Sequence, residues 1–212
     1  MQGIRVLLAD DHEVVRAGYR RLLESTDDIE VVAEATDGET AYQRYLQWHP
    51  SVVVMDLTMP GSGGLDASRR ILARDSAARI LVFSVHENEI FLNRALDLGI
   101  LGYISKRSAS RVMIEAVRSV AGGEPFIGQE MIPFLVKRKD SADSGLIADL
   151  SPREFEVFRL RAEGKSVNAI AELLNVSPKT VGHHNTRLKQ KLGASNSAEL
   201  TRLAIRLGLL TP

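Results

Sequence analysis

Short runs of valine, isoleucine and leucine alternate with longer segments of helical periodicity along residues 1–122. The runs predict strands near 4–9, 29–34, 52–56, 79–84 and 101–105, and the other segments predict helices near 13–25, 38–48, 65–74, 88–98 and 109–121. Apolar strands that alternate with helices are typical of a parallel sheet covered on both faces. We therefore expect an α/β fold with a five-stranded parallel sheet.

Three carboxylates lie at the ends of two of these predicted strands. Asp10 and Asp11 follow the strand at 4–9, and Asp56 ends the strand at 52–56, just before a Pro-Gly turn. The expected strand order is the flavodoxin-like 2-1-3-4-5, in which the carboxyl ends of strands one and three meet at a groove. The three acids should therefore converge in that groove.

Such a cluster is unfavourable by itself, because like charges repel, and a bound divalent cation relieves the repulsion. Mg²⁺ suits this set because it prefers oxygen ligands and keeps some of its water. The alternative is that the acids only cap helices and turns, as Asp often does. Ser84 and Lys106, at the ends of two further strands, favour the first interpretation, since a phosphoryl group on a carboxylate requires a hydroxyl and an ammonium nearby.

Residues 1 to about 122 resemble the receiver domain of two-component response regulators, and the run ADDHEVVRAG is similar to the NarL/FixJ-type subgroup. The resemblance implies that Asp56 accepts a phosphoryl group, that Asp10 and Asp11 bind Mg²⁺ with it, and that Ser84 and Lys106 contact the phosphoryl oxygens. We expect Tyr103, close to the lysine, to act as a switch whose burial changes as the loops move.

A length of 212 residues is more typical of two domains than of one. The chain has no cysteine, which excludes a disulfide framework, a thiolate metal site and a catalytic thiol. Its apolar runs are too short to span a bilayer, and no signal-peptide pattern precedes the first strand. These features predict a cytoplasmic protein that makes no contact with a membrane.

The zero net charge conceals an asymmetry between the two parts of the chain. Residues 151–212 hold ten Lys and Arg against five Asp and Glu, whereas residues 1–150 hold 17 against 22. A basic segment of this kind favours contact with a polyanion, although the opposite charges also suit contact between the domains. We expect a receiver domain at 1–122, a linker at 123–148, which includes a very polar stretch, and a second domain at 149–212.

Four helix starts can be read in the second domain. Ser151-Pro152-Arg153-Glu154 forms a capping box with proline at the first helical position. Ser166, Ser177 and Asn196 are suitable caps for three more helices. The segment therefore predicts a compact all-α module of four helices.

Within this module, residues 166–192 fit a helix-turn-helix motif. The predicted core consists of Ile170, Leu174, Val176, Val181, Leu188 and Leu192. In a recognition helix the N-terminal residues face base edges and the flanking cations bind phosphates. We therefore predict base contacts by Gly182, His183 and Thr186 and backbone contacts by Lys179, Thr180, Arg187 and Lys189, with Lys191 adding charge nearby. The alternative is that this charged face is only solvated.

Adjacent histidines raise the question of a metal site. Neighbouring residues on a helix with about 3.6 residues per turn point in different directions, and no third ligand is evident. Packing of His184 and a DNA contact by His183 are the preferred interpretation. His86 has no evident partner in the sequence.

Residues 149–210 resemble the LuxR-type DNA-binding domain, on the runs LSPRE, Ile170-Ala171, Thr180-Val181 and Lys191-Leu192. The resemblance implies that the last helix, which carries a wide apolar stripe, dimerises the protein on DNA. It also implies a response regulator that controls transcription after phosphorylation by a sensor histidine kinase. Two alternatives stay open. One is a phosphohydrolase, although the acids lack the nucleophile-x-acid spacing of the haloacid-dehalogenase group, and the other is a scaffold whose DNA binding ignores phosphate.

Overall fold

The computed structural model describes residues 3–61, 63–108, 110–137, 147 and 149–210. It divides the chain into two compact units, Met1–Val136 and Lys137–Pro212. Most of the polar stretch of the predicted linker lies outside the described residues, and the domain boundaries at 122 and 149 stay a prediction. In the part of the chain that is described, no helix is both long and apolar enough to cross a membrane.

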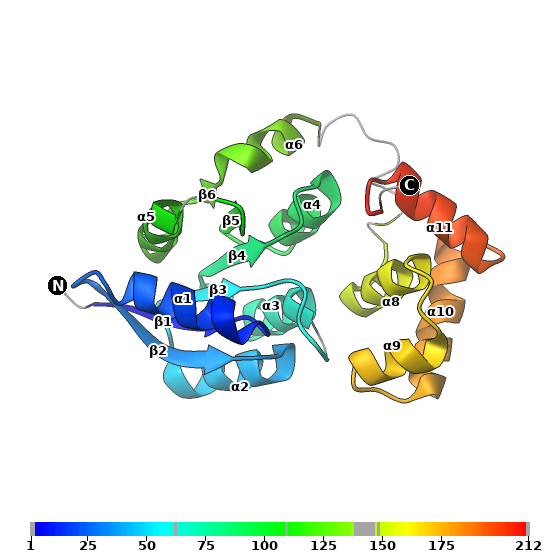
Figure 1. Ribbon diagram of the computed structural model, residues 1–212, viewed down its shortest axis with the longest axis horizontal. Helices are drawn as coiled ribbons and strands as arrows, with labels where there is room; N and C mark the ends of the chain where they lie inside the picture. Colours follow the sequence, from blue (N-terminus) through cyan, green and yellow to red (C-terminus); the bar gives the residue numbers. More distant parts are fainter. Residues whose placement is uncertain (1–2, 62, 109, 138–146, 148, 211–212) are drawn as a thin grey trace. The chain divides into compact units, whose positions relative to one another are not determined.

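The first unit contains a sheet of parallel strands in the order β2-β1-β3-β4-β5-β6, as Figure 1 shows. The five core strands are β1 (Ile4–Ala9), β2 (Ile29–Ala35), β3 (Val52–Met55), β4 (Ile80–Ser84) and β5 (Gly102–Ser105). They confirm the predicted parallel sheet and its order 2-1-3-4-5. The helices between and after them are α1 (Glu13–Leu23), α2 (Gly38–Trp48), α3 (Gly63–Arg74), α4 (Glu89–Asp97) and α5 (Ser110–Ala121).

Burial of both faces explains why the two central strands β3 and β4 are almost wholly apolar. Every residue of β3 and β4 is buried. On one face, side chains of β1, β3 and β4 form a core with α5 and with Leu23 at the end of α1. The helices α2 and α3 pack together over the opposite face (Figure 1). A sheet covered on both sides leaves only its strand ends open for chemistry.

The strand register brings the first and third strand ends level with each other. Ala9 of β1 pairs with Met55 of β3, and the Asp56 N–H donates to the Ala9 carbonyl at 2.9 Å. Asp10 and Asp56 therefore lie side by side where the chain leaves the sheet. At this point the connections after β1 and β3 go to opposite faces of the sheet, which is where α/β folds form their binding crevice.

A short sixth strand follows the five that the sequence predicts. The strand β6 (Phe126–Ile127) pairs in parallel with β5, Gly102 opposite Phe126. It is followed by the 3-10 helix η1 (Gln129–Met131) and by α6 (Ile132–Lys137). These elements belong to the first unit, apart from Lys137 at the end of α6. The sheet therefore continues past the point where α5 ends.

The second unit contains α8 (Pro152–Ala162), α9 (Val167–Leu173), α10 (Pro178–Leu192) and α11 (Ser197–Arg206). All four begin where the sequence predicts. The Ser151 hydroxyl and the Glu154 carboxylate form the capping box of α8, and Ser166, Ser177 and Asn196 each accept the backbone N–H three residues ahead. The helix α8 packs on each of the other three.

Candidate functional site

The three predicted acids converge at the carboxyl ends of β1 and β3. Asp10 and Asp56 are 1% and 2% exposed, whereas Asp11 is partly exposed. Ligand atoms of these three residues and of His12 all lie within 4.8 Å of one another. The convergence that strand order predicts is therefore present, with two of the carboxylates almost completely removed from water.

Lys106 lies between the two buried carboxylates. Its Nζ is 2.8 Å from Asp56 Oδ2 and 2.6 Å from Asp10 Oδ2. Burial lowers the pKa of Lys106, but the two carboxylates outweigh it, so the pKa of the ammonium is raised. The lysine therefore stays charged and already neutralises part of the acid cluster.

Asp56 itself has two opposing influences on its charge. Burial raises the pKa of this carboxyl, and the attraction of Lys106 lowers it by less, so the pKa lies above its ordinary value. The Thr58 N–H donates to Asp56 Oδ1 at 3.2 Å, and Lys106 holds the other oxygen. The carboxylate is therefore oriented by one donor on each oxygen.

The chemistry of the donor set fits a hard divalent cation such as Mg²⁺. The carboxylates of Asp10, Asp11 and Asp56 offer oxygen ligands from two loops. The backbone N–H of His12 donates to Asp10 Oδ1 at 2.8 Å. Asp11 Oδ1 is buried and accepts no hydrogen bond from the described residues, although His12 Nδ1 lies 3.0 Å from it. An acidic cluster of this form is typical of the magnesium site of a receiver domain.

Ser84 and Tyr103 lie on the neighbouring strands. The Ser84 side chain is fully buried at the end of β4, and its hydroxyl oxygen accepts the His86 N–H at 3.2 Å. Tyr103 on β5 is also fully buried, and its hydroxyl donates to the His86 carbonyl at 2.7 Å. Burial raises the pKa of Tyr103. The tyrosine therefore stands in its inward orientation in this structure.

His86 has partners that sequence reasoning missed. Its Nε2 is 2.9 Å from Thr58 Oγ1, and its ring stacks on Phe91 with centroids 4.0 Å apart. The expectation of no partner is wrong, because Thr58 is 28 residues away in the chain and only the sheet brings the two loops together. No local sequence pattern predicts this contact between His86 and Thr58.

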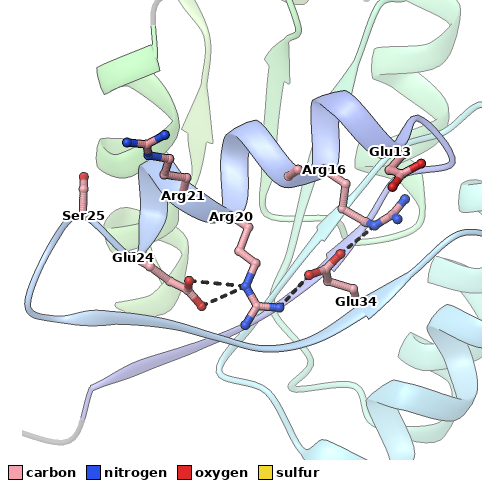
Figure 2. A pocket seen from close by; sticks show the side chains of 8 residues that line it. Glu13, Arg16, Arg20, Arg21, Glu24, Ser25 and Glu34 are labelled. Carbon is pink, nitrogen blue, oxygen red and sulfur yellow. Dashed lines mark hydrogen bonds and ion pairs between the residues drawn. The ribbon is translucent and has the colours of Figure 1, made fainter.

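An open groove of about 540 Å³ runs beside α1 and is lined by charged side chains (Figure 2). Glu34 bridges Arg16 at 2.7 Å and Arg20 at 2.6 Å, and Arg20 also contacts Glu24 at 3.2 Å. Arg16 donates to the Asp10 carbonyl at 2.8 Å as well. These pairs satisfy one another, so they hold α1 against β2 beside the acid cluster.

The predicted recognition helix is α10, and its two faces differ as expected. Val181 and Leu188 are fully buried with Ile170 and Leu174, while Val176 and Leu192 are partly buried. The outer face carries the residues predicted to contact DNA. Of these, Lys179, Thr180, His183, Thr186 and Arg187 are exposed, and Gly182 and Lys189 are partly exposed.

Several of these side chains also have contacts within the unit. The Thr186 hydroxyl donates to the Gly182 carbonyl at 3.0 Å, and Lys189 donates to the Ser195 carbonyl at 3.1 Å. Lys191 is held by Glu154 at 2.6 Å and by the Asp149 carbonyl at 2.8 Å. Lys191 therefore ties α10 to the start of α8.

The two adjacent histidines have different surroundings. His183 is exposed, whereas burial lowers the pKa of His184, helped by the charge of Arg153. Their ring centroids are 6.1 Å apart, with the rings at 64°. Among the described residues the two rings belong to no metal-binding group. The partial burial of His184 agrees with packing, and the DNA contact of His183 stays a prediction.

Two family descriptions match this chain. The response regulator receiver domain matches residues 6–118, and the bacterial regulatory proteins of the luxR family match residues 148–204. The response regulator UvrY of Escherichia coli K12 is 39% identical over 208 residues, which cover 97% of this chain and 95% of UvrY.

Solved structures of RcsB, one of them from Salmonella enterica serovar Typhimurium, are similar over both units. One, with RcsB bound to the promoter P1flhDC in the presence of the phosphomimetic BeF₃⁻, is 30% identical with a TM-score of 0.67 and covers 95% of this chain and 98% of RcsB. Another, with two RcsB dimers bound to two parallel DNAs, is 31% identical with a TM-score of 0.61 and the same coverage.

Proposed function

Because the chain belongs to the two-component response regulators that carry a LuxR-type DNA-binding domain, we propose that Asp56 is the phosphoacceptor that controls its binding to DNA. Members of this family accept a phosphoryl group and are not conventional enzymes. The observation that carries the proposal is the geometry of Asp56, a buried carboxylate with Lys106 at 2.8 Å and two further acids within reach.

The phosphodonor is a phosphohistidine on a sensor histidine kinase. One Asp56 oxygen attacks phosphorus, the new O–P bond forms, and the P–N bond to the imidazole breaks as that nitrogen leaves with the electron pair. Asp10, Asp11 and Asp56 would hold Mg²⁺. When bound, it supplies the positive charge that lets an anionic donor approach three carboxylates.

Lys106 has a role before and after the transfer. Before it, the ammonium neutralises the carboxylates of Asp10 and Asp56. Afterwards the phosphoryl group brings about two negative charges, and Lys106 turns to an oxygen of that group. Ser84, at the end of the adjacent strand, donates its hydroxyl to another oxygen.

Tyr103 couples phosphorylation of Asp56 to the loop that follows β4. Its hydroxyl bonds to the His86 carbonyl, while the His86 N–H bonds to Ser84. A movement of Ser84 toward a phosphoryl oxygen therefore strains the loop at His86, to which the Tyr103 hydroxyl is hydrogen-bonded. This gives the protein two loop states that phosphate can bias.

The output is binding of α10 in the major groove. Gly182, His183 and Thr186 face base edges, and the N-terminal and flanking residues Lys179, Thr180, Arg187 and Lys189 bind phosphates. An added Cβ at Gly182 would meet nothing within 4 Å, so this position is open to a close approach by DNA. The active form is a homodimer through α11, reads two half-sites, and works in the cytoplasm, where its DNA and kinase domain lie.

The mass of the intact protein tests the first step. Wild type, Asp56→Asn and the exposed control Asp27→Asn are incubated with Mg²⁺ and acetyl phosphate. Wild type and the control should each gain one phosphoryl group, and chelation of Mg²⁺ should abolish the gain. Equal gain by Asp56→Asn would exclude Asp56 as the acceptor, and no gain by any protein would exclude phosphate control.

A DNA fragment selected from a random pool by the phosphorylated protein tests the second step. Lys179→Ala should weaken binding to every sequence and reduce its salt dependence. His183→Ala should instead change sequence preference. If phosphorylated and unmodified wild type bind the fragment with equal affinity, phosphorylation does not control DNA binding, although the proposal that α10 binds DNA stands.

A further inference from the structure

Glu130 connects the segment after the receiver helices to the turn that carries Lys106. Its Oε1 accepts the Ser105 N–H at 2.9 Å and the Ser108 hydroxyl at 2.5 Å. These two donors flank Lys106 on either side. Glu130 itself belongs to η1, 22 residues beyond Ser108 and in a part of the chain with no evident link to the acid cluster in sequence.

The turn held by Glu130 is part of the phosphoacceptor site. Ser105 is the last residue of β5 and pairs with Ser84 of β4. The Lys106 N–H donates to the Ser84 carbonyl at 2.8 Å, and its Nζ contacts Asp56 at 2.8 Å. A displacement of Lys106 or Ser84 toward a phosphoryl group therefore moves the donors that Glu130 holds.

The segment around Glu130 is attached firmly to the sheet. The Phe126 N–H donates to the Leu101 carbonyl at 3.1 Å and the Gly128 N–H to the Tyr103 carbonyl at 2.8 Å. Met131, next to Glu130, is fully buried. This segment leads directly into α6, the last described helix of the first unit.

Gly128 makes room for the carboxylate. A Cβ at this position would lie 2.4 Å from Glu130 Oε1 and 2.9 Å from Glu130 Cδ. Any larger residue at 128 would push the carboxylate off its partners, while the glutamate could still rotate away without moving the backbone. The close approach is thus a second sign that the position of Glu130 is built into the segment.

We propose that Glu130 is a positioning residue for the Lys106 turn and that it transmits the phosphorylation state of Asp56 to residues 126–135, ahead of the DNA-binding unit. This inference rests on the proposed function and adds the path by which phosphorylation of Asp56 affects residues 126–135. Burial raises the pKa of Glu130, but its bonds to Ser108 and Ser105 outweigh this and lower it, so the carboxylate is a charged and strong acceptor at neutral pH.

Hydrogen–deuterium exchange on the full chain tests the route. Peptides covering 126–135 are compared before and after phosphorylation with acetyl phosphate and Mg²⁺, with phosphoryl content checked by intact mass. In wild type the exchange rate should change by about tenfold, the effect of one or two hydrogen bonds. In Glu130→Ala this change should disappear although the phosphoryl group is still gained.

Three further variants separate positioning from simple loss of structure. Glu130→Gln keeps an acceptor oxygen and should restore the wild-type response, and the exposed Glu124→Ala should behave as wild type. Gly128→Ala should lose the response with Glu130 unchanged, which keeps the test valid if Glu130→Ala does not fold. A full response in phosphorylated Glu130→Ala or Gly128→Ala would overturn the route alone, as would no response in phosphorylated wild type. Absence of phosphorylation in wild type would overturn the proposed function with it.

Discussion

Gly64→Ala tests how tightly the backbone beside the phosphoacceptor is packed. A Cβ at residue 64 would lie 1.9 Å from the carbonyl oxygen of Asp56, 2.8 Å from its carbonyl carbon and 2.9 Å from Leu57 Cα. All three are backbone atoms, so no side chain can rotate out of the way. The start of α3 and the loop after β3 must therefore move apart.

The size of that movement sets the expected cost. Ordinary contact begins at 3.4 Å, so the shortest of these distances falls short by 1.5 Å. Such a shift breaks the hydrogen bond from the Gly64 N–H to the Leu57 carbonyl, now 3.1 Å, at a cost of about 1 kcal/mol. Forced repacking adds about 1–3 kcal/mol. We expect the free energy of unfolding of the first unit to fall by about 2–4 kcal/mol.

Urea unfolding followed by tryptophan fluorescence measures this, because the single tryptophan, Trp48, lies in the first unit. Gly18→Ala in α1 is the matched control, since a Cβ there meets nothing within 4 Å and alanine stabilises a helix by about 0.5–1 kcal/mol relative to glycine. Phosphorylation of Gly64→Ala should also be slower, because Asp56 is displaced. A stability of Gly64→Ala equal to wild type, or raised as in the control, would refute the reasoning.

Three other outcomes follow from single residues. Because burial raises the pKa of Asp56 despite Lys106, the folded chain binds this proton more tightly than the unfolded chain. In the absence of metal, the free energy of unfolding should therefore fall as pH rises from 3.8 through the raised pKa of Asp56. Asp56→Asn should remove this pH dependence in urea unfolding measured with a chelator present. His184 should give the opposite pH dependence, because its pKa is lowered in the folded chain: its contribution to stability is complete above pH 6.5 and is lost as pH falls through the folded pKa. His184→Gln should reduce this loss of stability at low pH, measured by circular dichroism melts. Ser151→Ala removes the hydroxyl half of the α8 capping box and should cost about 1 kcal/mol in the same melts, whereas unchanged melting would show that the Glu154 half suffices.

Local sequence determined most of the secondary structure and the location of the acid cluster. Mostly apolar segments became the strands β1, β3 and β4, because a strand that is buried on both faces needs apolar side chains at successive positions. Ser151, Ser166, Ser177 and Asn196 start their helices as predicted, since a cap acts within three residues of itself. Parallel strand order then brought Asp10 and Asp56 to one edge.

The contacts that tune the site were decided by tertiary structure alone. In the sequence, Lys191 looks like one more cation of the predicted recognition helix, yet Glu154, 37 residues earlier, pairs with it. The bond between Thr58 and His86 joins two loops, and Glu130 reaches the Lys106 turn from beyond the fifth helix.

In the sequence, Gly64 is only a glycine just before the helix predicted at 65–74, and the structure shows that the backbone of Asp56 packs directly against it. Periodicity, caps and strand ends are visible in sequence because they depend on neighbours a few residues apart. Charge pairing and close packing depend on which distant segments the fold brings within about 4 Å, and that distance exists only once the chain has folded.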